Sequence, residues 1–197
     1  EMDEQTEREA SLEMAANVSS LVNEVKREGR WQAVFTAEQI NAWLAVDAAD
    51  GGPEADPDEA ILDHPADLLP PYLSDLRVAI EPEQVWIACR FKRDDWTSVL
   101  SLPVDIYLAK PDLIALRIGQ VRAGVIRLPF RLEKTLDGLV RAAHRHDLQV
   151  YRRQVEGDSV IEISIRPLGD EDDKTIRLDT LQLGEGKVYV AGSTGQP

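Results

Sequence analysis

The sequence has little cysteine, few histidines and no long hydrophobic run. One cysteine in 197 residues excludes an internal disulfide and a cysteine-based zinc site. No run of about 18 apolar residues is present, so no segment is expected to span a bilayer. Lys and Arg number 22 against 36 Asp and Glu, which gives a formal charge of −14. This charge repels phosphate backbones and disfavours nucleic acid as a partner.

The remaining composition is that of a folded protein. Apolar residues make up 43% and charged residues 29% of the chain, which argues against disorder. A chain of this length fits one domain, or one domain with an appendage. It starts with Glu1 and shows no signal peptide, which says little about a targeting or anchor segment ahead of Glu1.

The stretch from Leu76 to Phe130 predicts four β-strands. Apolar and polar residues alternate over 76–80, 85–91, 100–108 and 114–118, and short turns separate these segments. Such short turns favour an antiparallel meander. Pro103 cannot donate to a ladder and predicts an edge position or a bulge, while Gly119 and Gly124 predict bends.

Three amphipathic helices are expected around these strands. The first covers residues 4–28, and its polar first turns predict a projecting stalk. The second covers about 37–46, behind a capping box in which Thr36 caps and Gln39 reaches back. The third starts at Pro129 and ends near His146, with an apolar stripe at three- and four-residue spacing.

The overall expectation is an α+β fold with about eight strands. They would form a curved antiparallel sheet, or sheets, packed on a long central helix, with helices at the N-terminus. Four strands would precede the central helix and about four would follow it. The expected divisions are a helix or stalk at 1–30, one α+β domain at 31–192 with an acidic loop at 47–67, and a frayed tail at 193–197.

No catalytic, cofactor or metal motif emerges from the sequence, so we predict a protein without cofactor and not an enzyme. Cys89 lies on the apolar face of its strand, which favours core packing over nucleophilic catalysis. His144 and His146 are two residues apart and cannot chelate one metal on a helix. An enzyme would need His64, Asp58 and Glu59 to converge with an arginine in one cleft.

Large aromatic side chains are the candidate ligand-binding residues. An apolar ligand site would use Trp43, Trp86, Trp96 and Phe130, although Trp43 and Trp86 also suit an ordinary core. Four arginines recur near the Gly119–Phe130 turn. Either they mark an edge that faces an anion or they belong to the solvated face of a sheet: Arg117, Arg122, Arg127 and Arg131.

Two short segments resemble the YpmS-like family of bacterial extracytoplasmic proteins. FTAEQINAWL at residues 35–44 is similar to the family's "fTeeqlNayLa" opening, and GVIRLPF at residues 124–130 is similar to its "G-x-lplP" stretch before a helix. The order of elements agrees over most of residues 31–191, although the acidic insert after Val46 departs from the pattern. The resemblance implies an N-terminal membrane anchor, an extracytoplasmic domain and, more remotely, a curved sheet around a helix that holds lipid.

Two non-enzymatic functions follow as expectations. The first is an extracytoplasmic domain that holds an apolar ligand or lipid between sheet and helices, with membrane contact only through an N-terminal anchor. The alternative is a membrane-anchored structural or protein-interaction domain with a solid core and no ligand.

Overall fold

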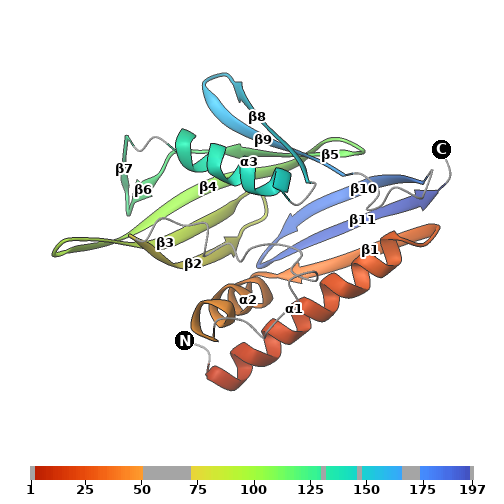
Figure 1. Ribbon diagram of the computed structural model, residues 1–197, viewed down its shortest axis with the longest axis horizontal. Helices are drawn as coiled ribbons and strands as arrows, with labels where there is room; N and C mark the ends of the chain where they lie inside the picture. Colours follow the sequence, from red (N-terminus) through yellow and green to blue (C-terminus); the bar gives the residue numbers. More distant parts are fainter. Residues whose placement is uncertain (1–2, 51–71, 130–131, 146–147, 166–173, 196–197) are drawn as a thin grey trace.

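The computed structural model describes residues 3–50, 72–129, 132–145, 148–165 and 174–195. They form an α+β fold with antiparallel sheets, as the sequence predicts (Figure 1). The helices are α1 (Glu4–Val25), α2 (Ala37–Asp50) and α3 (Glu133–Arg145). The strands are β1 (Gly29–Thr36), β2 (Leu73–Ile80), β3 (Val85–Arg93), β4 (Trp96–Lys110), β5 (Leu113–Ile118), β6 (Arg122–Ala123), β7 (Ile126–Arg127), β8 (Gln149–Val155), β9 (Asp158–Ser164), β10 (Thr175–Gly184) and β11 (Lys187–Gly195).

The strands divide over two sheets. Sheet A has the order β1-β11-β10, and sheet B has the order β2-β3-β4-β5-β9-β8, with β6 and β7 attached beside β4. The four strands expected after the central helix are present as β8 to β11, but in the described part of the chain seven strands rather than four precede it, and the two sets do not form separate sheets. The strands after α3 separate, because β9 pairs with β5 of the meander whereas β11 pairs with β1.

The meander and its turns are confirmed. Strands β2 to β5 pair with their sequence neighbours in antiparallel order. Two-residue loops join β3 to β4 and β8 to β9, and positive φ angles at Asp94, Glu156 and Gly157 give these loops their sharp reversal.

Pro103 lies inside sheet B rather than at its edge. It pairs with Trp86 of β3 on one side, and on the other side its carbonyl accepts the Gly119 N–H at 2.9 Å. The neighbouring strand is interrupted at this level, because β5 ends at Ile118 and β6 begins only at Arg122. A break in the adjacent strand thus accommodates the missing N–H of the proline.

The second helix begins as predicted and ends later. The Gln39 N–H donates to Thr36 Oγ1, and the Thr36 N–H donates to Gln39 Oε1, both at 3.1 Å, which confirms the capping box. The helix continues to Asp50, so residues 47–50 of the expected acidic loop are helical. Alanines at 48 and 49 favour helix, and the rest of that loop, 51–67, lies outside the described residues.

The first helix packs along the domain instead of projecting. It contacts α2 and β1, its Ala10 side chain is buried, and Glu7 in its second turn lies 3.6 Å from the Arg77 guanidinium. It ends at Val25, three residues before the predicted end. Within the described ranges, no helix is both long and apolar enough to cross a membrane.

The third helix starts at Glu133, four residues after Pro129. The Leu128 N–H donates to the Val121 carbonyl at 2.9 Å, which keeps the chain in sheet-like pairing up to that point. The helix then crosses one face of sheet B (Figure 1). Leu136 packs there against Val150 and Ile161, and Leu116 and Ile118 of β5 pack against the same cluster. The core beneath α3 is therefore built from strands that precede and follow it in sequence.

Sheet A has its own core around Trp31. The Trp31 indole packs on Ile176 and Leu178, and its Nε1–H donates to Thr194 Oγ1 at 3.2 Å. Thr194 in turn donates to the Val25 carbonyl at the end of α1. Because β11 continues to Gly195, residues 193–195 are paired strand and not the expected frayed tail.

Candidate functional site

The candidate site is a pocket at the interruption between β5 and β6. Its volume is about 510 Å³, and we call it the α3 pocket. Gly119 lies on its wall, and a Cβ atom there would come within 2.7 Å of Pro103 Cγ. The same proline–glycine contact that interrupts the strand therefore shapes one side of the pocket.

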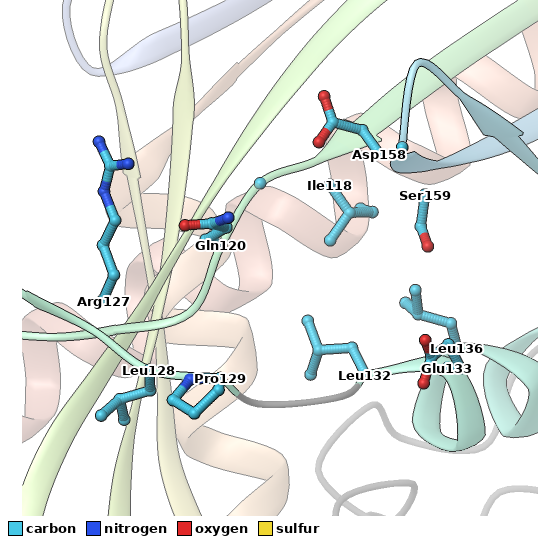
Figure 2. A pocket seen from close by; sticks show the side chains of 12 residues that line it. Ile118, Gln120, Arg127, Leu128, Pro129, Leu132, Glu133, Leu136, Asp158 and Ser159 are labelled. Atoms are coloured by element: carbon cyan, nitrogen blue, oxygen red, sulfur yellow. The ribbon is translucent and has the colours of Figure 1, made fainter.

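The α3 pocket combines apolar and polar walls (Figure 2). The close-up shows Ile118, Leu132 and Leu136 around one space, with Ser159 directed toward Leu136 and Arg127 on the far side. Two glycines complete the lining. The apolar lining residues are Ile118, Leu128, Pro129, Leu132 and Leu136, and the polar ones are Gln120, Arg127, Glu133, Asp158 and Ser159.

Three separate segments position these side chains. Leu132 and Leu136 are one helical turn apart at the start of α3, and the Leu136 N–H donates to the Leu132 carbonyl at 2.8 Å. The β8–β9 turn brings Asp158 and Ser159 to the opposite wall, because Ser159 pairs with Ile118 of β5. The pocket exists only where the helix start, the strand end and this turn meet.

The pocket has the size of a small-molecule site. Its volume lies in the range of small-molecule sites, which are usually apolar with a few polar groups. Glu133, Asp158 and Ser159 bring carboxylate and hydroxyl groups to the lining, and Arg127 is the cation among the described lining residues.

A second cavity of about 750 Å³ lies beside Trp31 and Gly192. Its lining is mixed, as that of the α3 pocket is: Trp31 and Tyr189 lie with polar and charged groups from α1 and sheet A, among them Glu24, Arg30 and Asp179. It offers fewer large apolar side chains than the α3 pocket does. The smaller α3 pocket is therefore the better candidate, despite its lower volume.

The tryptophans proposed from the sequence lie far apart. Trp86 pairs with Pro103 of β4, and Trp96 lies seven positions before Pro103 on that strand. The two tryptophans are therefore separated by about 23 Å along the strand. Arg122 lies over the Trp86 ring at 5.2 Å, Trp96 meets Phe91 edge-on at 5.5 Å, and Trp43 is half-buried in α2. None of these three lines the α3 pocket. Phe130 lies outside the described residues, as do His64, Asp58 and Glu59.

The histidine of α3 joins the helix to sheet B. His144 Nε2–H donates to the Val150 carbonyl at 2.6 Å, and Asp137 lies 3.0 Å from Arg152 of the same strand. These contacts fix α3 over β8. His146 lies outside the described residues, and among the residues that the structure describes no group of histidine, cysteine and carboxylate side chains could hold a metal ion.

Cys89 packs in the cluster formed by Phe91, Leu100 and Val121. Burial raises the pKa of the Cys89 thiol, which keeps it protonated at neutral pH. A protonated, half-buried thiol is a poor nucleophile.

We expect Cys89 of the folded protein to react with DTNB at least about tenfold more slowly than free cysteine at pH 8. In urea the rate should approach that of free cysteine, because unfolding exposes the thiol and restores its usual pKa. Stopped-flow absorbance measures both rates, with a Cys89→Ser variant as the blank. A folded-state rate above that of free cysteine would show an activated thiol instead.

Sequence reasoning missed the residues that form the α3 pocket. The apolar stripe expected after Pro129 includes Leu132 and Leu136, and the strand expected at 114–118 ends at Ile118, but nothing local in the sequence places these residues around one space. The sequence contains one signal for this site. Pro103 lies within one predicted strand, and Gly119 directly follows the end of the next predicted strand.

Comparison with known proteins gives no relative for this arrangement. No protein-family model, no curated protein and no solved structure matches the chain significantly.

Proposed function

We propose that the protein is a non-enzymatic binding domain that holds one apolar or amphiphilic molecule in the α3 pocket. The pocket itself carries this proposal, because Ile118, Leu132 and Leu136 would bury a hydrocarbon chain or ring system. Its charged lining residues, Arg127, Glu133 and Asp158, would face a polar end of the molecule. A lipid fragment or another small amphiphile fits this description.

Packing around the pocket supports a pre-formed site. Leu132 belongs to both the Phe91 cluster and the Leu136 cluster, so the start of α3 is held on two sides. Irregular pairing between β4 and β5 near Leu108 adds twist to sheet B. In this proposal sheet B curves around α3. The pocket then remains open at the start of α3, beside the interruption between β5 and β6.

We further propose that the domain works outside the cytoplasm, held by an N-terminal anchor. The resemblance of residues 35–44 and 124–130 to the YpmS-like family supports this placement. An interaction domain without a ligand is the competing proposal, and the three packed core clusters are compatible with it.

Filling the pocket should weaken ligand binding. Ser159→Phe places a large ring in the pocket, and we expect binding of 1-anilinonaphthalene-8-sulfonate, an apolar ring system with one sulfonate, to weaken at least about tenfold. Fluorescence titration measures the affinity, and thermal unfolding checks that the variant is folded. Ser74→Phe, at an exposed serine of β2 that does not line the pocket, is the matched control and should bind like the wild type.

Native mass spectrometry followed by solvent extraction would identify a natural ligand. One co-purified apolar molecule per chain, displaced by the sulfonate dye and absent from Ser159→Phe, would support the proposal. A clean ligand-free mass together with no dye binding, or equal binding by Ser159→Phe, would refute it and favour the interaction domain.

A further inference from the structure

The β6–β7 hairpin ends in two apolar side chains that the fold does not require. Arg122 pairs with Arg127 and Ala123 with Ile126, so Gly124 and Val125 form a two-residue loop. Gly124 has φ +59°, as the first loop residue of a type II′ turn requires. The turn geometry does not require a valine as the second loop residue, Val125.

Both side chains point into solvent. Val125 is 97% exposed and Ile126 is 63% exposed, and neither belongs to a core cluster. Exposed apolar residues also occur on the neighbouring β4, where Val99 is 60% and Trp96 56% exposed. Leu100 pairs with Ala123, and Ala123 pairs with Ile126, so Trp96 and Ile126 lie on the same face of sheet B, whereas Val99 lies on the opposite face.

These residues gather at one end of the molecule. In Figure 1 the β6–β7 hairpin and the β3–β4 hairpin lie together at the end opposite the C-terminus. Exposed apolar side chains that share one end of a protein form a candidate contact surface. We call Trp96, Val125 and Ile126 the apolar tip.

The charge beside the hairpin loop is opposite to that of the chain. Residues 119–129 contain two arginines and no aspartate or glutamate, in a protein of net charge −14. These two, Arg122 and Arg127, flank the hairpin loop, and the Arg122 guanidinium lies over the Trp86 ring. On the β3–β4 side, Lys92 and Arg93 are balanced by Asp94 and Asp95.

We propose that the apolar tip inserts into the headgroup region of a phospholipid bilayer, with Arg127 on an anionic lipid phosphate. Protruding apolar side chains flanked by cations are the features that interfacial binding requires. The net charge of the remaining chain would repel such a surface, so the contact is confined to this end. A protein partner would need a broader complementary face than a two-residue loop offers.

The hairpin also borders the α3 pocket, because Arg127 of β7 lines it. Insertion of the tip would place the pocket next to the lipid surface. The bilayer contact does not depend on a ligand in the pocket. The vesicle experiment therefore tests the bilayer contact separately from ligand binding.

Co-sedimentation with vesicles tests the proposal. We expect the protein to bind phosphatidylcholine vesicles that contain about 30 mol % phosphatidylglycerol, and to bind pure phosphatidylcholine more weakly. The double variant Val125→Ser/Ile126→Ser should bind about tenfold more weakly to both. Leu12→Ser removes an apolar side chain that is 71% exposed on α1, and should bind like the wild type.

Two further measurements separate charge from insertion. Arg127→Gln should weaken binding to the anionic vesicles only, whereas Arg30→Gln on β1 should not. Tryptophan emission should shift to shorter wavelength on binding, and Trp96→Phe should remove that shift. Absence of vesicle binding, or equal binding by the Val125→Ser/Ile126→Ser variant, would overturn the proposal. A lipid-independent dimer that this variant dissociates would identify a second copy as the occupant and also overturn it.

Discussion

Gly192→Ala is expected to destabilise the protein by at least about 3 kcal/mol. A Cβ atom at this position would lie 2.2 Å from the Arg177 carbonyl oxygen and 2.4 Å from Trp31 Cζ2. Gly192 pairs directly with Trp31 in sheet A, so the indole lies over the glycine and fills the space of a side chain. The clash involves backbone on β10, and a change of rotamer alone cannot relieve it.

Urea denaturation followed by circular dichroism measures the loss. Gly195→Ala is the matched control, since it lies on the same strand and a Cβ atom there meets nothing within 4 Å. It should change the free energy of unfolding by less than about 0.5 kcal/mol. Combining Gly192→Ala with Trp31→Phe should recover part of the loss, because the smaller ring vacates the Cζ2 position. Equal stability of Gly192→Ala and the wild type would show that sheet A does not pack as described.

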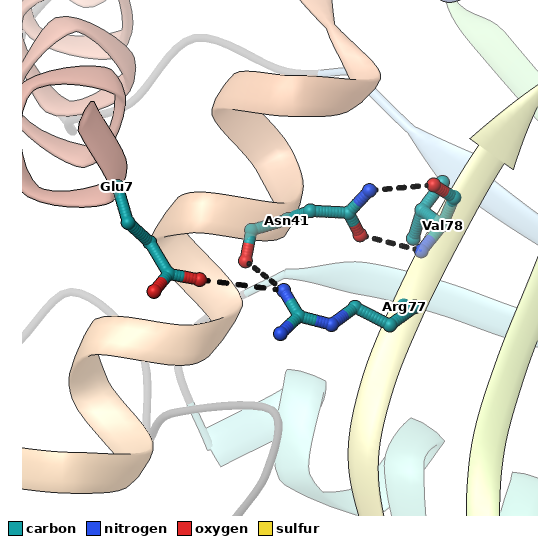
Figure 3. Close-up of polar contacts among 4 residues, drawn as sticks. All are labelled: Glu7, Asn41, Arg77 and Val78. Atoms are coloured by element: carbon teal, nitrogen blue, oxygen red, sulfur yellow. Dashed lines mark hydrogen bonds and ion pairs between the residues drawn. The ribbon is translucent and has the colours of Figure 1, made fainter. Parts of the chain in front are cut away.

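Asn41→Ala is expected to lower the free energy of unfolding by about 2–3 kcal/mol. The Asn41 side chain pairs with the edge of β2 as a peptide group would (Figure 3). Its Nδ2–H donates to the Val78 carbonyl at 2.8 Å, and the Val78 N–H donates to Oδ1 at 2.6 Å. Arg77 beside it donates to the Asn41 carbonyl and lies 3.6 Å from Glu7 of α1. Removing the amide leaves two half-buried backbone groups of β2 without these partners.

The isosteric change Asn41→Asp separates hydrogen bonding from packing. The new carboxylate still accepts from Val78 N–H but faces the Val78 carbonyl with an oxygen. Its pKa should therefore rise on folding, so the loss of stability is smallest at low pH and grows as pH rises through that pKa.

Hydrogen exchange at the Val78 amide and urea denaturation measure the effects of both changes at position 41. Asn23→Ala and Asn23→Asp, at an exposed position of α1, are the controls and should be nearly neutral. If both position-41 variants match their Asn23 controls, α2 does not hold the edge of sheet B.

Much of the local structure could be predicted because short-range chemistry decides it. The Thr36–Gln39 capping box, the loop at Asp94–Asp95 and the turn at Glu156–Gly157 each depend on residues within three or four positions of one another. The alternation in β3 to β5 depends only on the two-residue period of a strand. Antiparallel pairing of the meander followed from loop length.

The errors have long-range causes. Pro129 has the conformation that suits a helix start, but the pairing of Leu128 with Val121 delays α3 to Glu133. Polar residues suggested that the start of α1 projects, but contacts with Arg77 and α2 hold it against the domain. The C-terminal residues look like a loose tail in the sequence. In the structure, Ser193 and Thr194 pair with β1, which comes from the other end of the chain.

The sequence by itself determined the fold class, most element positions and the turn chemistry, since each is a sum of local preferences and periodicity. Only the tertiary structure decided how the strands divide over two sheets and where the α3 pocket lies. Those outcomes depend on contacts between distant residues: Gly119 against Pro103, Trp31 over Gly192, and Asn41 on the edge of β2. An isolated glycine or asparagine looks the same in a sequence whether it ends a turn or completes a sheet, because its role is set by the partner that folding brings to it.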